Sequence, residues 1–225
     1  MLIAEDLLLL VTDDASGRLS VPADQVDAGL GGANLVELTL RNKVDLTGEQ
    51  DPGRPGRIIV RDPSPAGDAV LDAALEVVTG YQGKKPFTVI KPLSKNLRRT
   101  LYERLASSGV VRGEKTRILG LFPARRWPAQ DASHEAEVRR LMTQALVQQG
   151  ATDTRTAALI ALVRALRCEG KIVDPRPYGL TKRELRARAK EIAEGNWASE
   201  AVRKAIEEMM AAVVVVVTAG AAGGG

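Results

Sequence analysis

The side chains of this sequence best suited to chemistry are lysines and arginines that could hold a phosphate. Lys95 and Arg98 are spaced i, i+3 with Arg99 next to them, so in a helix Lys95 and Arg98 would lie close together on the surface. Ammonium and guanidinium groups donate charge-assisted hydrogen bonds to phosphate oxygens. A basic helix face is often only a solvated surface, so the spacing leaves both interpretations open.

A second basic group comes directly after an apolar segment. Arg125, Arg126 and Trp127 follow a stretch that contains Leu121 and Phe122. An apolar tip flanked by arginines is typical of a hairpin that inserts into a membrane surface or self-associates. In that case Phe122 and Trp127 would project from the domain, and truncating both would leave its stability nearly unchanged. The alternative is an ordinary hairpin whose Phe122 packs on its own domain.

Few residues are available for catalysis or metal binding. The single Cys, Cys168, excludes an internal disulfide and a cysteine-cluster metal site, and the single His, His134, disfavours zinc sites and conventional triads. We expect His134 on a helix surface and Cys168 as an inert thiol, because a cysteine nucleophile requires a paired base. These counts predict a protein that is not an enzyme and uses no cofactor and no metal.

Charge is distributed unevenly along the 225 residues. The formal net charge is +4, but residues 1–83 carry −8, residues 84–128 carry +10 and residues 129–225 carry +2. The basic block 84–128 also holds four of the seven aromatic residues. Basic and aromatic side chains together suit either a nucleic-acid groove or a membrane interface with anionic headgroups.

The elements that position these side chains are expected to be mainly helical. Apolar periodicity and capping signals predict helices over 1–11, 29–41, 68–78, 94–107, 133–149, 154–167, 181–194 and from 199 onward. The apolar run 209–217 is too short to span a bilayer and is expected to be a buried terminal helix or strand. The pattern predicts one globular domain over 1–218, built around a central helical bundle, and a flexible tail over 219–225.

Two small β-hairpins complete this mainly α fold. One is expected to pair 44–46 with 57–61, and the other to pair 110–111 with 118–122. The stretch 80–92 is expected to be a polar connector. A helix followed by a two-stranded wing is also the order found in winged-helix DNA-binding modules, which keeps a nucleic-acid function open as the alternative.

Several short patterns occur in a characteristic order along the chain. They are the acidic and leucine-rich Leu2–Leu10, the glycine-rich Gly29–Gly32 with the helix Leu35–Arg41, the segment Ala66–Leu75, the helix Leu97–Gly109 and the leucine-rich Leu159–Leu166. Together they resemble the Golgi phosphoprotein 3 family of peripheral membrane proteins over nearly the whole chain. The abundance of Ala, Arg, Gly and Val is typical of a bacterial homologue from a GC-rich, actinobacterial-type genome.

The resemblance implies binding of phosphatidylinositol 4-phosphate at the cytosolic face of a membrane. The family's headgroup pocket uses two basic residues spaced i, i+3, which match Lys95 and Arg98. It also uses an Arg in the glycine-rich turn and a Trp, which here match Gly31 and a position near Pro22. Because these two elements are missing, binding of anionic headgroups is expected, but selectivity for this one phosphoinositide is in doubt.

The resemblance also assigns a role to the second hairpin. The family's hairpin helps it oligomerise and enter the leaflet, and it matches Lys115 to Trp127. We therefore expect a cytoplasmic protein, peripheral on the inner face of a membrane, that binds anionic lipid through Lys95, Arg98 and Arg99. Self-association would use the hairpin, and nucleic acid is the less favoured partner.

Overall fold

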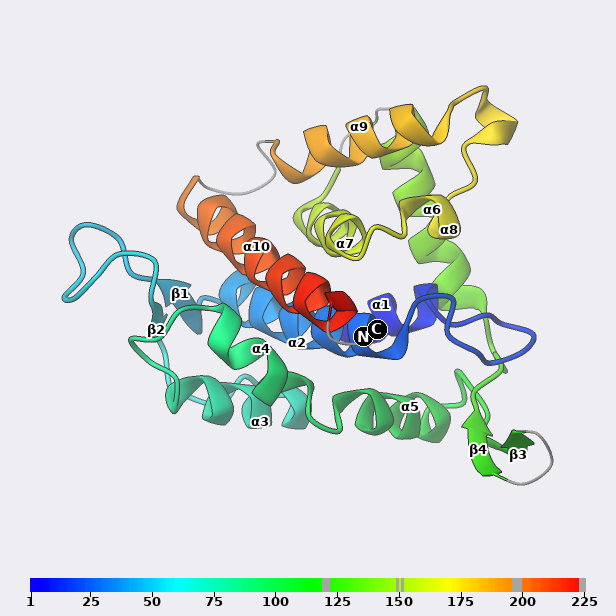
Figure 1. Ribbon diagram of the computed structural model, residues 1–225, viewed down its shortest axis with the longest axis horizontal. Helices are drawn as coiled ribbons and strands as arrows, with labels where there is room; N and C mark the ends of the chain where they lie inside the picture. Colours follow the sequence, from blue (N-terminus) through cyan, green and yellow to red (C-terminus); the bar gives the residue numbers. More distant parts are fainter. Residues whose placement is uncertain (119–121, 149, 151, 196–199, 223–225) are drawn as a thin grey trace.

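The fold is built around one buried helix, α2 (Ala23–Leu40). The computed structural model describes residues 1–118, 122–148, 150, 152–195 and 200–222. From Val26 to Thr39 almost every residue of α2 is buried, as expected for a helix surrounded by others. α1 (Ile3–Leu10), α4 (Phe87–Ser94), α7 (Thr154–Ala165) and α10 (Glu200–Ala222) pack against it (Figure 1). The described residues form ten α-helices and two small antiparallel sheets, which confirms the predicted mainly helical fold.

The glycine-rich segment lies inside α2, so the prediction that it opens this helix was wrong. A Cβ on Gly31 would lie 2.6 Å from the carbonyl oxygen of Ile90 in α4. A Cβ on Gly32 would lie 2.4 Å from Cγ2 of Val213 in α10. The glycines therefore let neighbouring helices approach α2 closely, and this packing offsets the roughly 1 kcal/mol by which each Gly disfavours a helix interior.

The first hairpin forms as predicted, and a short helix appears where a connector was expected. β1 (Val44–Leu46) pairs with β2 (Ile58–Val60), and α3 (Ala69–Thr79) begins after Asp68, whose side chain caps it. α4 was missed because lysines and prolines flank its short apolar pattern. Its Val89, Ile90 and Leu93 are buried.

α5 (Leu97–Ser107) is separated from α4 by a break in the backbone. The predicted helix 94–107 was wrong at its start, because Ser94 ends α4 and Asn96 adopts a left-handed conformation with φ of 61°. Lys95 is the C-terminal cap of α4, whereas Arg98 lies in the first turn of α5. Their i, i+3 spacing therefore does not place them on one helix face.

The second hairpin has a different register from the predicted one. β3 (Glu114–Ile118) pairs with β4 (Phe122–Arg126), with Glu114 opposite Arg126 and Ile118 opposite Phe122. Val111 instead forms an isolated bridge with Ala129 at the base. Pro123 lies inside β4, which a two-stranded ribbon tolerates because one edge of each strand has no partner.

The C-terminal half is helical, as predicted. It contains α6 (Ser133–Gln148), α7, the short α8 (Glu169–Ile172), a 3-10 turn η1 (Arg176–Tyr178), α9 (Lys182–Ala193) and α10. The apolar run 209–217 belongs to α10, which continues to Ala222. Within the described part of the chain, no helix is both long and apolar enough to cross a bilayer.

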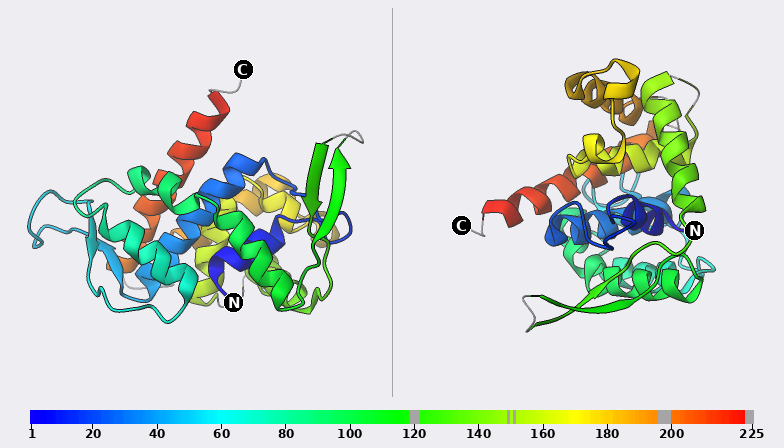
Figure 2. Two further views of the ribbon diagram at one scale, coloured as in Figure 1. Left: turned by 90° about the horizontal axis from the view of Figure 1, so that it is seen from below. Right: turned by 90° about the vertical axis from the view of Figure 1, so that its right-hand side faces the viewer.

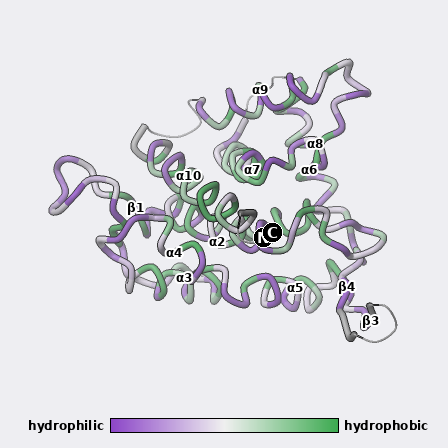
Figure 3. Tube along the Cα trace, viewed as in Figure 1, coloured by the Kyte–Doolittle hydropathy of each residue, from purple (hydrophilic) through white to green (hydrophobic). Residues whose placement is uncertain are grey.

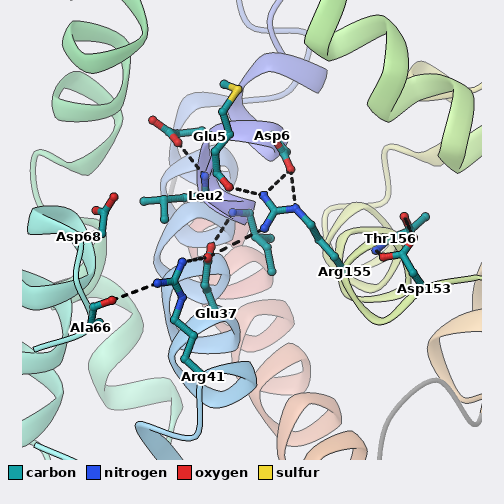
Figure 4. A network of polar contacts seen from close by, with 12 residues as sticks. Leu2, Glu5, Asp6, Glu37, Arg41, Ala66, Asp68, Asp153, Arg155 and Thr156 are labelled. Atoms are coloured by element: carbon teal, nitrogen blue, oxygen red, sulfur yellow. Dashed lines mark hydrogen bonds and ion pairs between the residues drawn. The ribbon is translucent and has the colours of Figure 1, made fainter. Parts of the chain in front are cut away.

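A buried polar network joins α1 to the rest of the bundle (Figure 4). Its centre is three buried carboxylates, Glu5, Asp6 and Glu37. Each is paired with an arginine: Arg104 lies 2.9 Å from Glu5, Arg155 lies 2.7 Å from Asp6 and Arg41 lies 2.7 Å from Glu37. The backbone N–H of Ile3 also donates to Glu37, and Nε2 of His134 lies 2.8 Å from Asp6. The charged groups of this network are paired with one another and stabilise the fold.

Candidate anion-binding site

Four segments far apart in the sequence line an open hollow of about 620 Å³. They are the loop between α1 and α2, the N-terminal part of α2, the end of α4 with the start of α5, and the residues that end the second hairpin (Figure 1). We call this site the basic hollow. Its charged and aromatic lining residues are Arg18, Asp27, Arg98, Arg99, Tyr102, Arg125, Arg126 and Trp127.

The lining carries five arginines against a single carboxylate among the described residues, that of Asp27 in α2. Nε of Arg98 lies 3.3 Å from Oδ1 of Asp27. Burial raises the pKa of Asp27, with the positive charge of Arg98 opposing the shift and the negative charge of Asp24 adding to it. The Asp27 carboxylate is thus less stable in its charged form than an exposed aspartate would be.

The other arginines of the basic hollow are weakly paired or unpaired. Arg99 and Arg125 share the exposed Glu103, at 3.9 and 3.7 Å, and such exposed pairs contribute little. Within the part of the chain that the structure describes, no carboxylate lies in ion-pair distance of Arg18 or Arg126. These two guanidinium groups have their full donor capacity available for an anion.

A stacked aromatic pair lines one side of the basic hollow. The rings of Tyr102 and Trp127 are stacked, with centroids 5.0 Å apart and planes 4° from parallel. The Tyr102 hydroxyl lies 2.7 Å from that of Thr12, which itself donates to the carbonyl of Leu8. Since Thr12 has one hydroxyl proton, Tyr102 is the donor to Thr12. Burial raises the pKa of Tyr102, so it remains a neutral donor at physiological pH.

A tight turn places Arg18 against the base of the hairpin. The N–H of Gly17 donates to the carbonyl of Asp13, and the N–H of Trp127 donates to the carbonyl of Gly17 at 3.3 Å. Gly17 has a φ of 60°, and a Cβ there would lie 2.3 Å from the Trp127 nitrogen. Only glycine fits this contact, which brings Arg18 to the hollow lined by Arg126.

The structure brings together most of the residues singled out from the sequence, in a different arrangement. Arg98 and Arg99 of the helix share one hollow with Arg125 and Arg126 of the hairpin. Lys95 is exposed outside this lining, and its role as a headgroup ligand remains a prediction. Arg18 was missed; it is the one basic residue in the first 40 positions.

Trp127 does not project from the hairpin as an exposed anchor. Its side chain is 8% exposed, because it packs on Tyr102 at the base of the ribbon. This burial contradicts the expectation that Trp127 projects from the domain, so we now expect its truncation to lower stability. Leu121 lies outside the described residues, and of Phe122 only the backbone position in β4 is described. The predicted role of these two residues at the tip remains a prediction.

His134 and Cys168, the two residues considered for catalysis, both lie in contacts that belong to the fold. His134 lies against Asp6 in the buried network. Cys168 is buried, and burial raises the pKa of its thiol to about 12, so it is an unreactive thiol at neutral pH. Across the described ranges, no group of three His, Cys, Asp or Glu side chains could hold a metal ion.

Comparison with known proteins identifies the family of this chain. The sequence model of the family described as Golgi phosphoprotein 3 (GPP34) matches residues 3–209. The chain belongs to the Golgi phosphoprotein 3 family. The vacuolar protein sorting-associated protein 74 of Eremothecium gossypii is 27% identical over 165 residues, which cover 64% of this chain and 48% of that protein. The chain spans about half the length of this curated relative.

The structure places the two positions that the resemblance matches to missing parts of the family's headgroup pocket. Gly31, which the resemblance matches to the family's turn arginine, has no room for a side chain, because a Cβ there would lie 2.6 Å from the carbonyl oxygen of Ile90. Pro22, near which the resemblance places the family's tryptophan, is the exposed N-terminal cap of α2. In this chain an arginine and a tryptophan reach the basic hollow from other segments, as Arg18 and Trp127.

Proposed function

We propose that this protein binds the anionic or phosphorylated headgroups of membrane lipids in the basic hollow. The observation that carries the proposal is the convergence of five arginines on one hollow whose described lining residues include a single carboxylate. An excess of unpaired guanidinium groups is stabilised by a multiply charged anion. Membership of the Golgi phosphoprotein 3 family favours a phosphoinositide such as phosphatidylinositol 4-phosphate as that anion.

The five arginines would contribute to binding in different ways, according to whether each has an ion-pair partner. Arg18 and Arg126, which have no ion pair in the described structure, would donate directly to phosphate oxygens. Arg98 would exchange its contact with Asp27 for the ligand. Arg99 and Arg125, whose side chains are exposed and only weakly paired, would add long-range attraction of about 1 kcal/mol each near an anionic surface.

This binding would make the protein peripheral on the cytoplasmic face of a membrane. Its role would be recognition, with no catalytic step. The hairpin tip around Phe122 would add leaflet insertion or self-association, as the family resemblance implies. Lys95, exposed at the end of α4, would contribute a further positive charge outside the hollow.

Vesicle cosedimentation of a double variant tests the proposal. Arg18→Gln with Arg126→Gln removes two charges without breaking an ion pair of the described structure, so folding should be unaffected. Binding to anionic vesicles should fall by roughly thirtyfold, or about 2 kcal/mol. The matched control is Arg54→Gln with Lys84→Gln, which removes the same charge from a separate hollow near the first hairpin.

Three outcomes would count against the basic hollow as the site. Unchanged binding by the Arg18 and Arg126 variant would remove both residues from it. An equal loss in the Arg54 and Lys84 control would show that only net charge matters. Binding of duplex DNA at the same salt concentration in preference to vesicles would favour the nucleic-acid alternative.

A further inference from the structure

The C-terminal end of α10 has apolar side chains all round, of which Val214, Val216 and Val217 are partly buried against the core and Val215 is exposed. Five consecutive valines, Val213 to Val217, occupy this part of the helix. Because a helix turns by about 100° per residue, five consecutive positions point in all directions. Val213 is fully buried beside Gly32 of α2, whereas Val215 is 53% exposed. Figure 3 shows this end of α10 as strongly hydrophobic.

This end of the helix is poorly suited to water. Valine is a weak helix former because its branched side chain loses rotamer freedom, and it normally occurs in a helix where packing compensates. No charged residue occurs after Glu208, so the exposed side of this segment carries no charge. A helix that is hydrophobic all round belongs in a protein core or in lipid.

The apolar end lies next to the basic hollow. A Cβ on Gly220 would lie 3.1 Å from the carboxylate of Asp24, in the first turn of α2. One turn further along the same helix, Asp27 lines the basic hollow. Both views of Figure 2 show the end of α10 and the β3–β4 hairpin projecting from the same side of the molecule.

We propose that the end of α10, from Val214 to Gly220, is a second membrane contact that inserts shallowly into the leaflet while the basic hollow holds a headgroup. This inference rests on the proposed function, because a bilayer with anionic headgroups is the partner that satisfies both neighbouring surfaces. The segment is too short to span the bilayer and would lie among the headgroups and upper acyl chains.

A fluorescent probe at Val215 tests insertion directly. The variant Val215→Cys can be labelled with an environment-sensitive dye in the natural chain, because buried Cys168 has a raised pKa and should not react. On binding to phosphatidylcholine vesicles containing phosphatidylserine, its emission should shift to the blue, and spin-labelled acyl chains should quench it. The control is Tyr178→Cys in η1, where the side chain is 49% exposed and should stay in water.

The outcomes separate this inference from the proposed function. If the labelled protein cosediments with vesicles while the Val215 probe keeps its emission in water, α10 does not insert, and binding by the basic hollow stands. If the protein does not cosediment, both proposals fail. If the probe shifts without vesicles as protein concentration rises, the occupant is a second copy of the chain, and membrane insertion is overturned.

A substitution at Val215 tests how much this contact contributes to vesicle affinity. Val215→Ser should lower vesicle affinity by about fivefold, because one exposed apolar side chain is lost from the contact. Ala211→Ser, at an exposed position of the same helix closer to its N-terminus, is the matched control and should leave affinity unchanged. Equal affinities of the Val215 variant and the control, with both proteins folded, would overturn the inference.

Discussion

The polar network around α1 and the basic hollow use the same kinds of side chain in opposite ways. In the network, the buried carboxylates of Glu5, Asp6 and Glu37 each have an arginine partner within 3 Å. In the hollow, five arginines meet one carboxylate among the described lining residues, Arg99 and Arg125 reach only the exposed Glu103, and no ion pair is formed by Arg18 or Arg126 within the described chain. A buried charge must be paired because its desolvation is costly, whereas an exposed arginine can remain unpaired in water. Pairing therefore separates the charges that hold this fold from those that can bind a ligand.

Trp127 lines the basic hollow but is buried with the core, and its truncation should have the largest effect. Trp127→Ala is expected to lower the free energy of unfolding by about 4 kcal/mol, because a buried ring stacked on Tyr102 is lost. Chemical denaturation would measure this loss. Trp127→Phe, which keeps a ring against Tyr102, should recover much of the stability. A Trp127→Ala protein as stable as the parent would place the hairpin base outside the core.

Breaking one pair of the network should affect stability and not binding. Arg155→Met leaves Asp6, which is 2% exposed, without its arginine, so unfolding should become easier by about 3 kcal/mol. Arg99→Met in the basic hollow should change stability by less than about 0.5 kcal/mol, because its contact with Glu103 is exposed. Urea denaturation of both variants makes the comparison. Similar losses of unfolding free energy in the two variants would show that ion pairing does not distinguish the polar network from the basic hollow.

Asp27 should make vesicle binding depend on pH. Its pKa is raised by burial, so it takes up a proton at a higher pH than an ordinary aspartate. Protonation removes the negative charge that faces Arg98, and binding to anionic vesicles should therefore strengthen as the pH falls. Asp27→Asn should bind about fivefold more tightly at neutral pH, or about 1 kcal/mol.

The difference between parent and Asp27→Asn isolates this group from other titrating carboxylates. Cosedimentation at several pH values should show the two proteins converging as the pH falls. A constant ratio of affinities across this range would mean that Asp27 does not control Arg98.

Lipid selectivity should be the smallest effect. Because Gly31, which the resemblance matches to the family's turn arginine, has no room for a side chain, we expect fine discrimination among headgroups to be lost. Vesicles containing phosphatidylinositol 4-phosphate should bind within about threefold of vesicles with the same charge density from phosphatidylserine, or roughly 0.7 kcal/mol. A preference above tenfold would mean that Arg18 and Trp127 rebuild a selective pocket.

Local patterns in the sequence were sufficient for most of the fold. Apolar periodicity and capping residues predicted the helices of the C-terminal half and the hairpin of β1 and β2, because these signals act between residues a few positions apart. The same reading failed at Asn96. One residue with a left-handed backbone breaks the helix there, so Lys95 and Arg98 lie on separate helical segments and do not share a helix face.

What the sequence determined about the site was its chemistry: a basic block, few reactive side chains and arginines at 98, 99, 125 and 126. Tertiary structure alone decided that these arginines share one hollow, that Arg18 joins them and that Trp127 turns inward. These outcomes depend on contacts such as that between Gly17 and Trp127, whose residues lie far apart along the chain. No local period encodes such a contact, because it forms only when separately specified elements pack together.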